Sequence, residues 1–230
     1  MWDPQVARFA DDHRIVTFDP RGVGKSGRLT SWRDILSQQA DDLAALFDEL
    51  GIDRAVVCGV SYGGVLAQRF ALDYPARISG LVVADSFSDT RPRSVGAAAQ
   101  WLLLYLSGWA WLLPAGMLMP AIRRQYRRWP LALSYLEVDI RQLRKLETTK
   151  VRYALNGVSY TSELDRISCP TLGIVGTASP ALLAYMRHLT AAIPKSRLAE
   201  VPDSFDPSNL CQPEEFDRLL AGFLDEIGWR

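Results

Sequence analysis

The chain has 230 residues, enough for one domain with an insertion. It is formally neutral and 48% hydrophobic, so it can bury a large core and lacks the basic surface that nucleic-acid-binding proteins need. Its three cysteines are too few and too scattered for a disulfide framework, and no zinc-site spacing occurs. With no signal peptide at the N-terminus, the sequence predicts a cytoplasmic protein with reduced thiols, no metal, no other cofactor and no nucleic-acid partner.

The first elements are a short helix at residues 5–10 and a buried strand at residues 14–18. The loop that follows ends in Gly-Lys-Ser at residues 24–26, as a phosphate-binding loop does. That motif requires glycine five positions before its second glycine, and the residue there is Asp19. A carboxylate at this place repels phosphate, so we expect no nucleotide site.

A helix follows, with Ser31 as its predicted N-cap and Asp34 three positions later in the manner of a capping box. Its apolar residues recur at helical spacing and define one buried face: Leu36, Ala40, Leu43, Phe47 and Leu50. Gly51 is expected to end this helix.

The next stretch carries the strongest functional motif. A β-favouring run enters Gly59-Val60-Ser61-Tyr62-Gly63, and a helical pattern follows at once. This strand–turn–helix context predicts a nucleophile elbow, in which Ser61 is presented on a strained turn. Gly59 and Gly63 would let strand and helix approach closely, and the helix N-terminus favours a developing negative charge. The alternative is a glycine-rich turn with an incidental serine.

Further strands at residues 81–84, 171–176 and 196–201 alternate with amphipathic helices, and Pro213 opens the last helix. This alternation predicts an α/β protein with a mostly parallel sheet and helices on both faces. Ligand sites in such sheets lie beyond the C-terminal ends of the strands. Ser61 and Asp85 are both expected at that edge.

The alternation stops between residues 91 and 163, which predicts a helical cap inserted into a core of residues 1–90 and 164–230. Residues 94–122 carry no charge, and their length alone would suit a transmembrane helix. Glycines and prolines break the stretch, so we favour cap helices. The breaks are Gly108, Pro114, Gly116 and Pro120.

Four arginines with interleaved aromatic residues follow in the same insertion, and a further helix is expected at residues 134–153. The cluster comprises Arg123, Arg124, Arg127 and Arg128, with Tyr126 and Trp129. It is interpreted as a solvated basic face with aromatic anchors in the core of the cap. The alternative is peripheral contact of residues 94–129 with an anionic membrane surface.

Three segments, residues 19–26, 59–64 and 209–216, resemble the α/β-hydrolase fold family. Within that fold, residues 61–68, 86–90 and 111–118 resemble maspardin-like members. The resemblance implies that Ser61 is the nucleophile and that the Tyr62 N–H group stabilises the oxyanion.

The chain departs from the family at the other catalytic positions. Ser179 stands where the resemblance implies the acid, and Asp206 stands where it implies the histidine. Asp85 is a candidate relocated acid. His13 precedes the first strand and His188 lies within a helix, so neither is expected to serve as the base. An ordinary aspartate, with a pKa of about 4, is a poor base toward serine.

The segments that the resemblance implies for the family's first three strands are not in this sequence. Residues 14–18 and 55–59 must then pair directly or leave unpaired edges, which invite association such as a homodimer. A late chain start in a longer protein and a true truncation are both open explanations.

Two functional hypotheses follow. The first is a weakly active or non-catalytic maspardin-like protein that binds an apolar ligand or a protein partner through its cap. The second is a serine hydrolase of esters or small acyl substrates, with Asp206 or a partner's residue as the base. Membrane-surface docking through residues 94–129 is a third idea.

Overall fold

The computed structural model describes residues 1–91, 102 and 107–229. Within them the sheet has four strands, all parallel, in the order β1-β2-β3-β4. The register pairs Val60 with Ala84 and Ala84 with Ile174, so Ser61 and Asp85 follow neighbouring strands at the same edge. The strands are β1 (Ala55–Val60), β2 (Ile78–Ala84), β3 (Thr171–Gly176) and β4 (Ser196–Val201).

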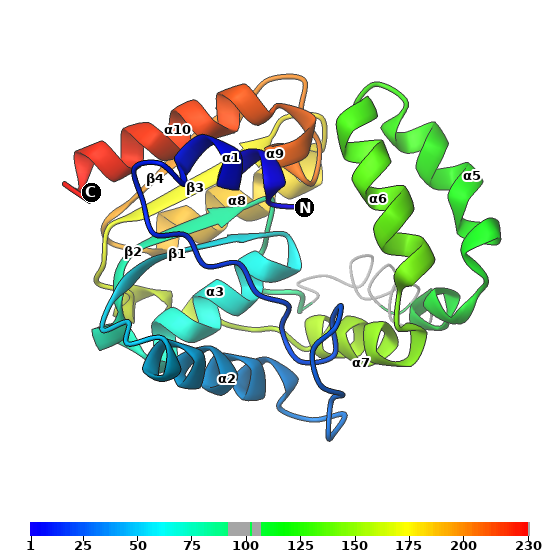
Figure 1. Ribbon diagram of the computed structural model, residues 1–230, viewed down its shortest axis with the longest axis horizontal. Helices are drawn as coiled ribbons and strands as arrows, with labels where there is room; N and C mark the ends of the chain where they lie inside the picture. Colours follow the sequence, from blue (N-terminus) through cyan, green and yellow to red (C-terminus); the bar gives the residue numbers. More distant parts are fainter. Residues whose placement is uncertain (92–101, 103–106, 230) are drawn as a thin grey trace.

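Helices cover both faces of this sheet, as the alternating pattern predicts (Figure 1). One face packs against α1 and α10, and the other packs against α2, α3 and α8. Short helices η1 (Pro75–Arg77) and α9 (Ser208–Cys211) join these elements. The long helices are α1 (Asp3–Phe9), α2 (Ile35–Glu49), α3 (Tyr62–Asp73), α8 (Pro180–Ala192) and α10 (Pro213–Glu226).

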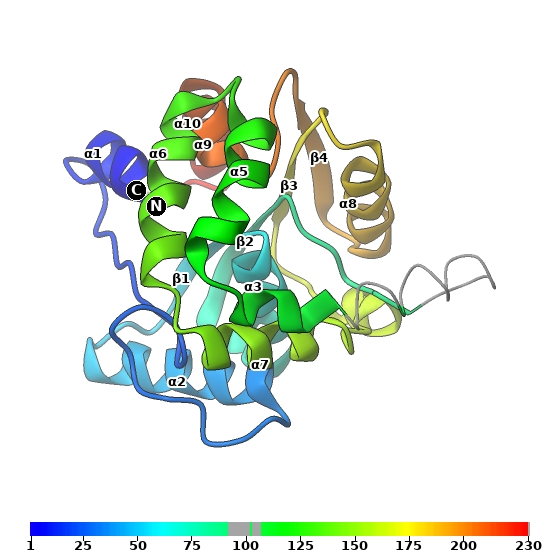
Figure 2. The same ribbon diagram turned by 90° about the vertical axis from the view of Figure 1, so that its right-hand side faces the viewer.

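The described part of the segment between β2 and β3 is mainly helical, and its helices α5 and α6 stand beside the sheet (Figures 1 and 2). We refer to its helices α5, α6 and α7 as the cap; the division of the chain into core and cap stays a prediction. The elements of this segment are η2 (Ser107–Leu112), α5 (Ala115–Tyr126), α6 (Pro130–Gln142), α7 (Lys145–Leu155) and η3 (Thr161–Arg166).

The sequence predicts one helix at residues 134–153 and cap helices within the uncharged stretch 94–122. The single helix expected at residues 134–153 is two helices, because Leu143 leaves helical geometry with ψ 129° and Arg144 with ψ 83°. Residues 94–101 and 103–106 of the uncharged stretch 94–122 lie outside the described residues. In the part that is described, no helix combines the length and the hydropathy that crossing a membrane requires.

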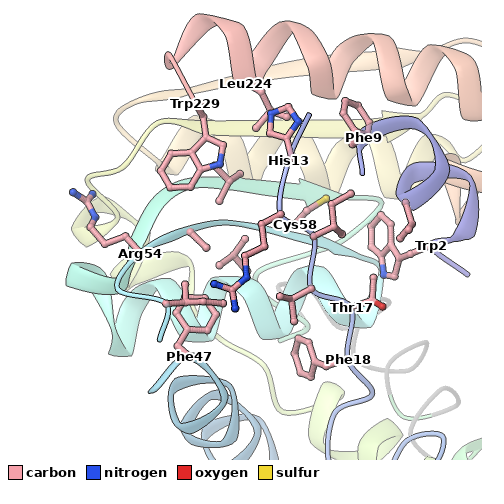
Figure 3. Close-up of a pocket in the computed structure, with 18 of the residues that line it drawn as sticks. Trp2, Phe9, His13, Thr17, Phe18, Phe47, Arg54, Cys58, Leu224 and Trp229 are labelled. Carbon is pink, nitrogen blue, oxygen red and sulfur yellow. The ribbon is translucent and has the colours of Figure 1, made fainter. Parts of the chain in front are cut away.

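The predicted strand at residues 14–18 does not form. These residues have no strand partner, and Ile15, Val16 and Phe18 are 36–41% exposed. They line a cavity of about 710 Å³ whose opposite wall includes residues of β1 (Figure 3). Aromatic side chains of Trp2, Phe9, Phe47 and Trp229 also line it (Figure 3). A strand forms only where its backbone groups find a ladder partner, and here the cavity separates the two segments.

Helix α2 keeps most of the predicted buried face, since Leu36, Ala40, Leu43 and Phe47 are buried. Leu50, the fifth predicted member, is half-buried and is the C-cap of the helix. Its start differs from the prediction. Ser31 is not the N-cap, because its Oγ instead accepts a hydrogen bond from the Arg33 backbone at 2.8 Å. The N-cap is Asp34, in a left-handed conformation with φ 56°.

Candidate active site

Ser61 lies on a sharp turn between β1 and α3, as the motif predicts. Its φ of 54° and ψ of −118° are unusual for a residue with a side chain, and such strain is common at functional positions. The backbone N–H of Ser61 donates to the Ala84 carbonyl at 2.8 Å, which fixes the turn against β2.

The glycines around the turn allow this close approach, although not all in the predicted way. A β-carbon on Gly59 would lie 2.1 Å from the Gly63 carbonyl oxygen, and one on Gly64 would lie 2.7 Å from the Ser86 side chain. A β-carbon on Gly63 would meet no described atom within 4 Å. The steric requirement therefore falls on Gly59 and Gly64, and the expectation for Gly63 is wrong.

The Ser61 hydroxyl has a carboxylate partner. Its Oγ donates to Oδ2 of Asp206 at 2.7 Å. Asp206 lies on the loop between β4 and α9, at the position where the family resemblance implies a histidine. The structure therefore brings together the two residues that the sequence could only place on separate segments.

Asp206 is not an ordinary carboxyl group. Burial, and to a smaller extent the neighbouring charge of Asp85, raise its pKa to about 7, although the Ser61 hydrogen bond and the charge of Arg152 lower it. The expectation of a carboxylate with a pKa of about 4 is therefore wrong at this position. A base whose pKa lies near neutrality is suited to accept a proton in catalysis.

Asp85 follows β2 and is 1% exposed. Its Oδ1 accepts a hydrogen bond from the Gly176 backbone at 2.9 Å, and its Oδ2 accepts one from the Ser208 backbone at 2.6 Å. Burial raises the pKa of Asp85 to about 6, although these bonds favour its charged form. Asp85 thus anchors the loop that carries Asp206 and adds negative charge beside it.

Tyr62, the other predicted residue, begins α3. Its backbone N–H belongs to the first turn of a helix, where such groups have no acceptor within the helix and can bind an anion. Its side-chain hydroxyl donates to Oε1 of the fully buried Gln39, whose Nε2 donates to the Arg21 carbonyl at 2.6 Å. This network joins the elbow to the loop that follows residues 14–18.

The cap contacts the Asp206 loop directly. The Tyr126 hydroxyl donates to the Asp206 carbonyl oxygen at 2.5 Å, and Trp129 Nε1 donates to the Asp203 carbonyl at 2.9 Å. The rings of Trp129 and Phe205 stack with centroids 6.1 Å apart. The sequence interpretation of Tyr126 and Trp129 as anchors within the cap is therefore incomplete, because they pack with Ala132 of α6 and also against this loop. They hold a loop about 80 residues away, which no local pattern reveals.

The Ser61 hydroxyl bonds to Asp206 and not to Ser179, His13 or His188, the other polar residues considered in the sequence analysis. Ser179, at the usual acid position, caps α8 by accepting a hydrogen bond from the Leu182 backbone at 3.3 Å. His13 lines the cavity beside β1, and His188 is exposed on α8. In the described part of the chain, no group of three or more candidate ligands is placed to hold a metal ion.

Comparison with known proteins identifies the family of this fold. The model of the alpha/beta hydrolase fold family matches residues 1–210. The chain is 29% identical to 3-oxoadipate enol-lactonase 1 of Acinetobacter baylyi, over 99% of this chain and 84% of the relative. It is also 29% identical to RutD of Shigella flexneri, over 98% of this chain and 86% of that protein.

Two solved structures are similar over nearly the whole chain. The enol-lactonase of Burkholderia xenovorans superposes with a TM-score of 0.81 at 25% identity, covering 97% of this chain and 85% of that one. A thermophilic esterase of Thermogutta terrifontis gives a TM-score of 0.81 at 25% identity, covering 98% and 85%. The chain belongs to the alpha/beta hydrolase fold family.

Proposed function

We propose that this protein is a serine hydrolase of esters or similar small acyl substrates, with Ser61 as the nucleophile and Asp206 as the base. The observation that carries the proposal is the hydrogen bond of 2.7 Å from Ser61 Oγ to the half-buried carboxylate of Asp206, whose pKa is raised to about 7. The relatives support this direction, because an enol-lactonase and an esterase both act on ester bonds.

The reaction follows from the positions of these groups. Ser61 Oγ attacks the acyl carbon while its proton passes to Asp206, and the tetrahedral oxyanion forms at the Tyr62 N–H group. The alcohol leaves with the proton that Asp206 held. A water molecule then gives a proton to Asp206 and attacks the acyl-serine. As the carboxylic acid leaves, Asp206 returns this proton to Ser61 Oγ, which restores both residues.

Because the base is a carboxylate and not a histidine, we expect a low turnover rate. Loss of the base in a serine-triad enzyme costs on the order of a millionfold in turnover. The raised pKa of Asp206 recovers part of that loss, because proton transfer is most effective when the base has a pKa near the working pH. We therefore expect slow but measurable hydrolysis, which separates this proposal from a non-catalytic protein.

The competing proposal is a maspardin-like protein that binds a partner or an apolar ligand through its cap. What favours it is the presence of Ser179 and Asp206 at the positions that the family resemblance gives to the acid and the histidine. It predicts that Ser61 is inert, and the named relatives give it no support.

Active-site labelling and burst kinetics separate the two proposals. The hydrolase should react with a fluorophosphonate probe and release a burst of p-nitrophenol from p-nitrophenyl acetate. Both signals should vanish in Ser61→Ala and Asp206→Asn but persist in Ser134→Ala, which changes an exposed serine of α6. No labelling of a folded wild-type protein, or labelling that survives in Ser61→Ala, would contradict the hydrolase.

Location and membrane contact are further proposals from the sequence. A cytoplasmic location would fit the three cysteines, none of which forms a disulfide bond in the described part of the chain. Membrane docking through residues 94–129 is weakened by ion pairs of Arg123 with Glu137 and of Arg128 with Asp203. Liposome flotation that does not change when Arg123 and Arg124 are replaced by alanine would remove that idea.

A further inference from the structure

Arg152 is a partly buried cation of the cap with an unusual environment. It lies on α7, and its guanidinium carbon is 5.9 Å from the ring centroid of Trp111. Burial lowers its pKa, and among the described residues Asp206 is the charged group that raises it. Among the described residues, no carboxylate lies within ion-pair distance of its guanidinium, and residues 92–106 contain no acidic side chain.

Several other cap arginines have a bonding partner or are exposed to solvent, as Arg124 and Arg127 are. Arg123 contacts Glu137 at 2.7 Å, Arg128 contacts Asp203, and Arg144 donates to the Ser26 carbonyl at 2.5 Å. A guanidinium has five N–H donors, and burying them without acceptors is unfavourable. Arg152 therefore has hydrogen-bonding capacity that the described residues do not use.

The C-terminal end of α7, which carries Arg152, is tied to the loop that follows β2. The Ser86 hydroxyl donates to the Ser61 carbonyl at 2.9 Å. Four residues later in the same loop, the Thr90 hydroxyl contacts the carbonyls of Leu155 and Asn156 at 3.2 and 2.9 Å, at the C-terminus of α7. One short segment thus joins the elbow to the last turn of α7.

Electrostatics agree with this placement. The positive charge of Arg152 lowers the pKa of Asp206, and the negative charge of Asp206 raises that of Arg152. Oδ2 of Asp206 is nevertheless bonded to Ser61 and not to the guanidinium. Asp85 and Asp206 together would repel an anionic ligand, so a site that accepts one needs a cation at this place.

We propose that Arg152 binds an anionic group of the substrate, so that the Ser61 site takes esters or lactones that also carry a carboxylate. This inference rests on the proposed hydrolase function. A guanidinium pairs with a carboxylate through two parallel hydrogen bonds, which lysine cannot reproduce. The cation–π contact with the Trp111 ring would help to keep the guanidinium in place.

A matched pair of substrates tests the proposal. Monomethyl glutarate and dimethyl glutarate contain the same methyl ester, but only the first carries a carboxylate. Arg152→Met should raise the KM for the monoester about 10- to 100-fold with little change in kcat, and should leave the diester nearly unaffected. Arg152→Lys should recover part of the loss. Arg124→Met, an exposed arginine of α5, is the control for the loss of one positive charge.

The contrary result is equally specific. If Arg152 serves only as the counterion of Asp206, then Arg152→Met changes kcat and its pH profile for both esters alike, and the KM difference between them stays the same. That outcome, or a wild-type protein with no preference for the monoester, would overturn the proposal.

A binding measurement separates this inference from the hydrolase proposal. Calorimetric titration of monomethyl glutarate into the Ser61→Ala variant requires no turnover. Binding there that is lost in the Ser61→Ala/Arg152→Met double variant supports the anion site even if neither ester is hydrolysed. Absence of binding to Ser61→Ala counts against Arg152, whatever the activity of the wild type.

Discussion

Oδ2 of Asp85 lies 2.6 Å from the backbone nitrogen of Ser208, two residues after Asp206. This bond ties the end of β2 to the loop that carries the proposed base. Asp85 therefore acts on Asp206 in two ways: it holds the loop in place, and its charge raises the pKa of Asp206. The two carboxyl groups titrate as a pair, so each should respond to a change in the other.

The first prediction concerns Asp85→Asn. Removing the charge should move the midpoint of the pH–rate profile below its wild-type position near pH 7, because the negative charge that raises the pKa of Asp206 is gone. The amide can accept only one of the two backbone hydrogen bonds well, so stability should fall by about 1–3 kcal/mol. Initial rates between pH 5 and 9 and urea unfolding measure both effects. An unchanged midpoint would show that the two carboxyl groups do not interact.

The second prediction concerns stability and pH. The folded-state pKa of Asp206, about 7, lies above the unfolded value of about 4. The folded protein therefore disfavours the ionised form, and the cost grows as the pH rises from about 4 to about 7. Asp206→Asn should be more stable than the wild type at pH 8, by up to about 4 kcal/mol, with the difference vanishing below pH 4.

Urea unfolding at pH 4 and pH 8 measures this difference. Asp165→Asn, which changes an exposed residue of η3, is the control and should show no gain at pH 8. The same Asp206→Asn protein should have lost its hydrolytic activity. Equal stability of Asp206→Asn and wild type at pH 8 would show that Asp206 is not held in a disfavoured charged form.

The elbow could be predicted from the sequence because its determinants are local. Gly59, Ser61 and Gly64 lie within six residues, and the strand before them and the helix after them have clear patterns. The four strands of the sheet and the buried face of α2 could be predicted for the same reason. Each depends on the spacing of apolar residues in one short stretch.

The chemistry of Asp206 could not be predicted in this way. Its raised pKa comes from burial and from Asp85, which is 121 positions earlier in the chain and meets it only in the folded protein. The strand expected at residues 14–18 fails for a related reason. Its residues have the right composition, but strand formation depends on a pairing partner, which composition does not encode.

The third prediction is that Asp206→His raises activity. An imidazole at this position would be an effective base for Ser61, and Asp85 lies close enough to affect the charge of whatever stands there. We expect kcat to rise about tenfold or more at pH 8, since general-base catalysis contributes about 10²- to 10⁴-fold. Asp206→Asn should fall below the wild type. A folded Asp206→His protein with lower kcat than wild type would show that the base is not what limits turnover.

The fourth prediction concerns the edge of the sheet. Among the described residues β1 pairs only with β2, and the exposed Val16 and Phe18 line the cavity beside it. An unpaired apolar edge promotes self-association, so the molar mass measured by light scattering should rise with protein concentration. Val16→Lys/Phe18→Lys should reduce that rise. Val138→Lys, an exposed position on α6, should not, and an equal effect of both variants would mean that general charge is responsible.

The fifth prediction concerns the contact between the cap and the base. The Tyr126 hydroxyl donates to the carbonyl oxygen of Asp206 at 2.5 Å, so Tyr126→Phe removes one anchor of the loop without removing the ring that packs against Phe205. The variant should lose about 1 kcal/mol of stability. Because Asp206 must stay within hydrogen-bond reach of Ser61, kcat should fall about three- to tenfold while KM changes little.

Steady-state kinetics with p-nitrophenyl acetate, together with thermal unfolding, measure the two effects of Tyr126→Phe. Tyr185→Phe removes a hydroxyl from a side chain that is 50% exposed on α8, and it should change neither quantity. If Tyr126→Phe lowers stability but leaves kcat intact, the cap contact supports the fold and not the position of the base. A fall in kcat in a variant that remains folded at the assay temperature would instead show that the cap contact positions Asp206 relative to Ser61.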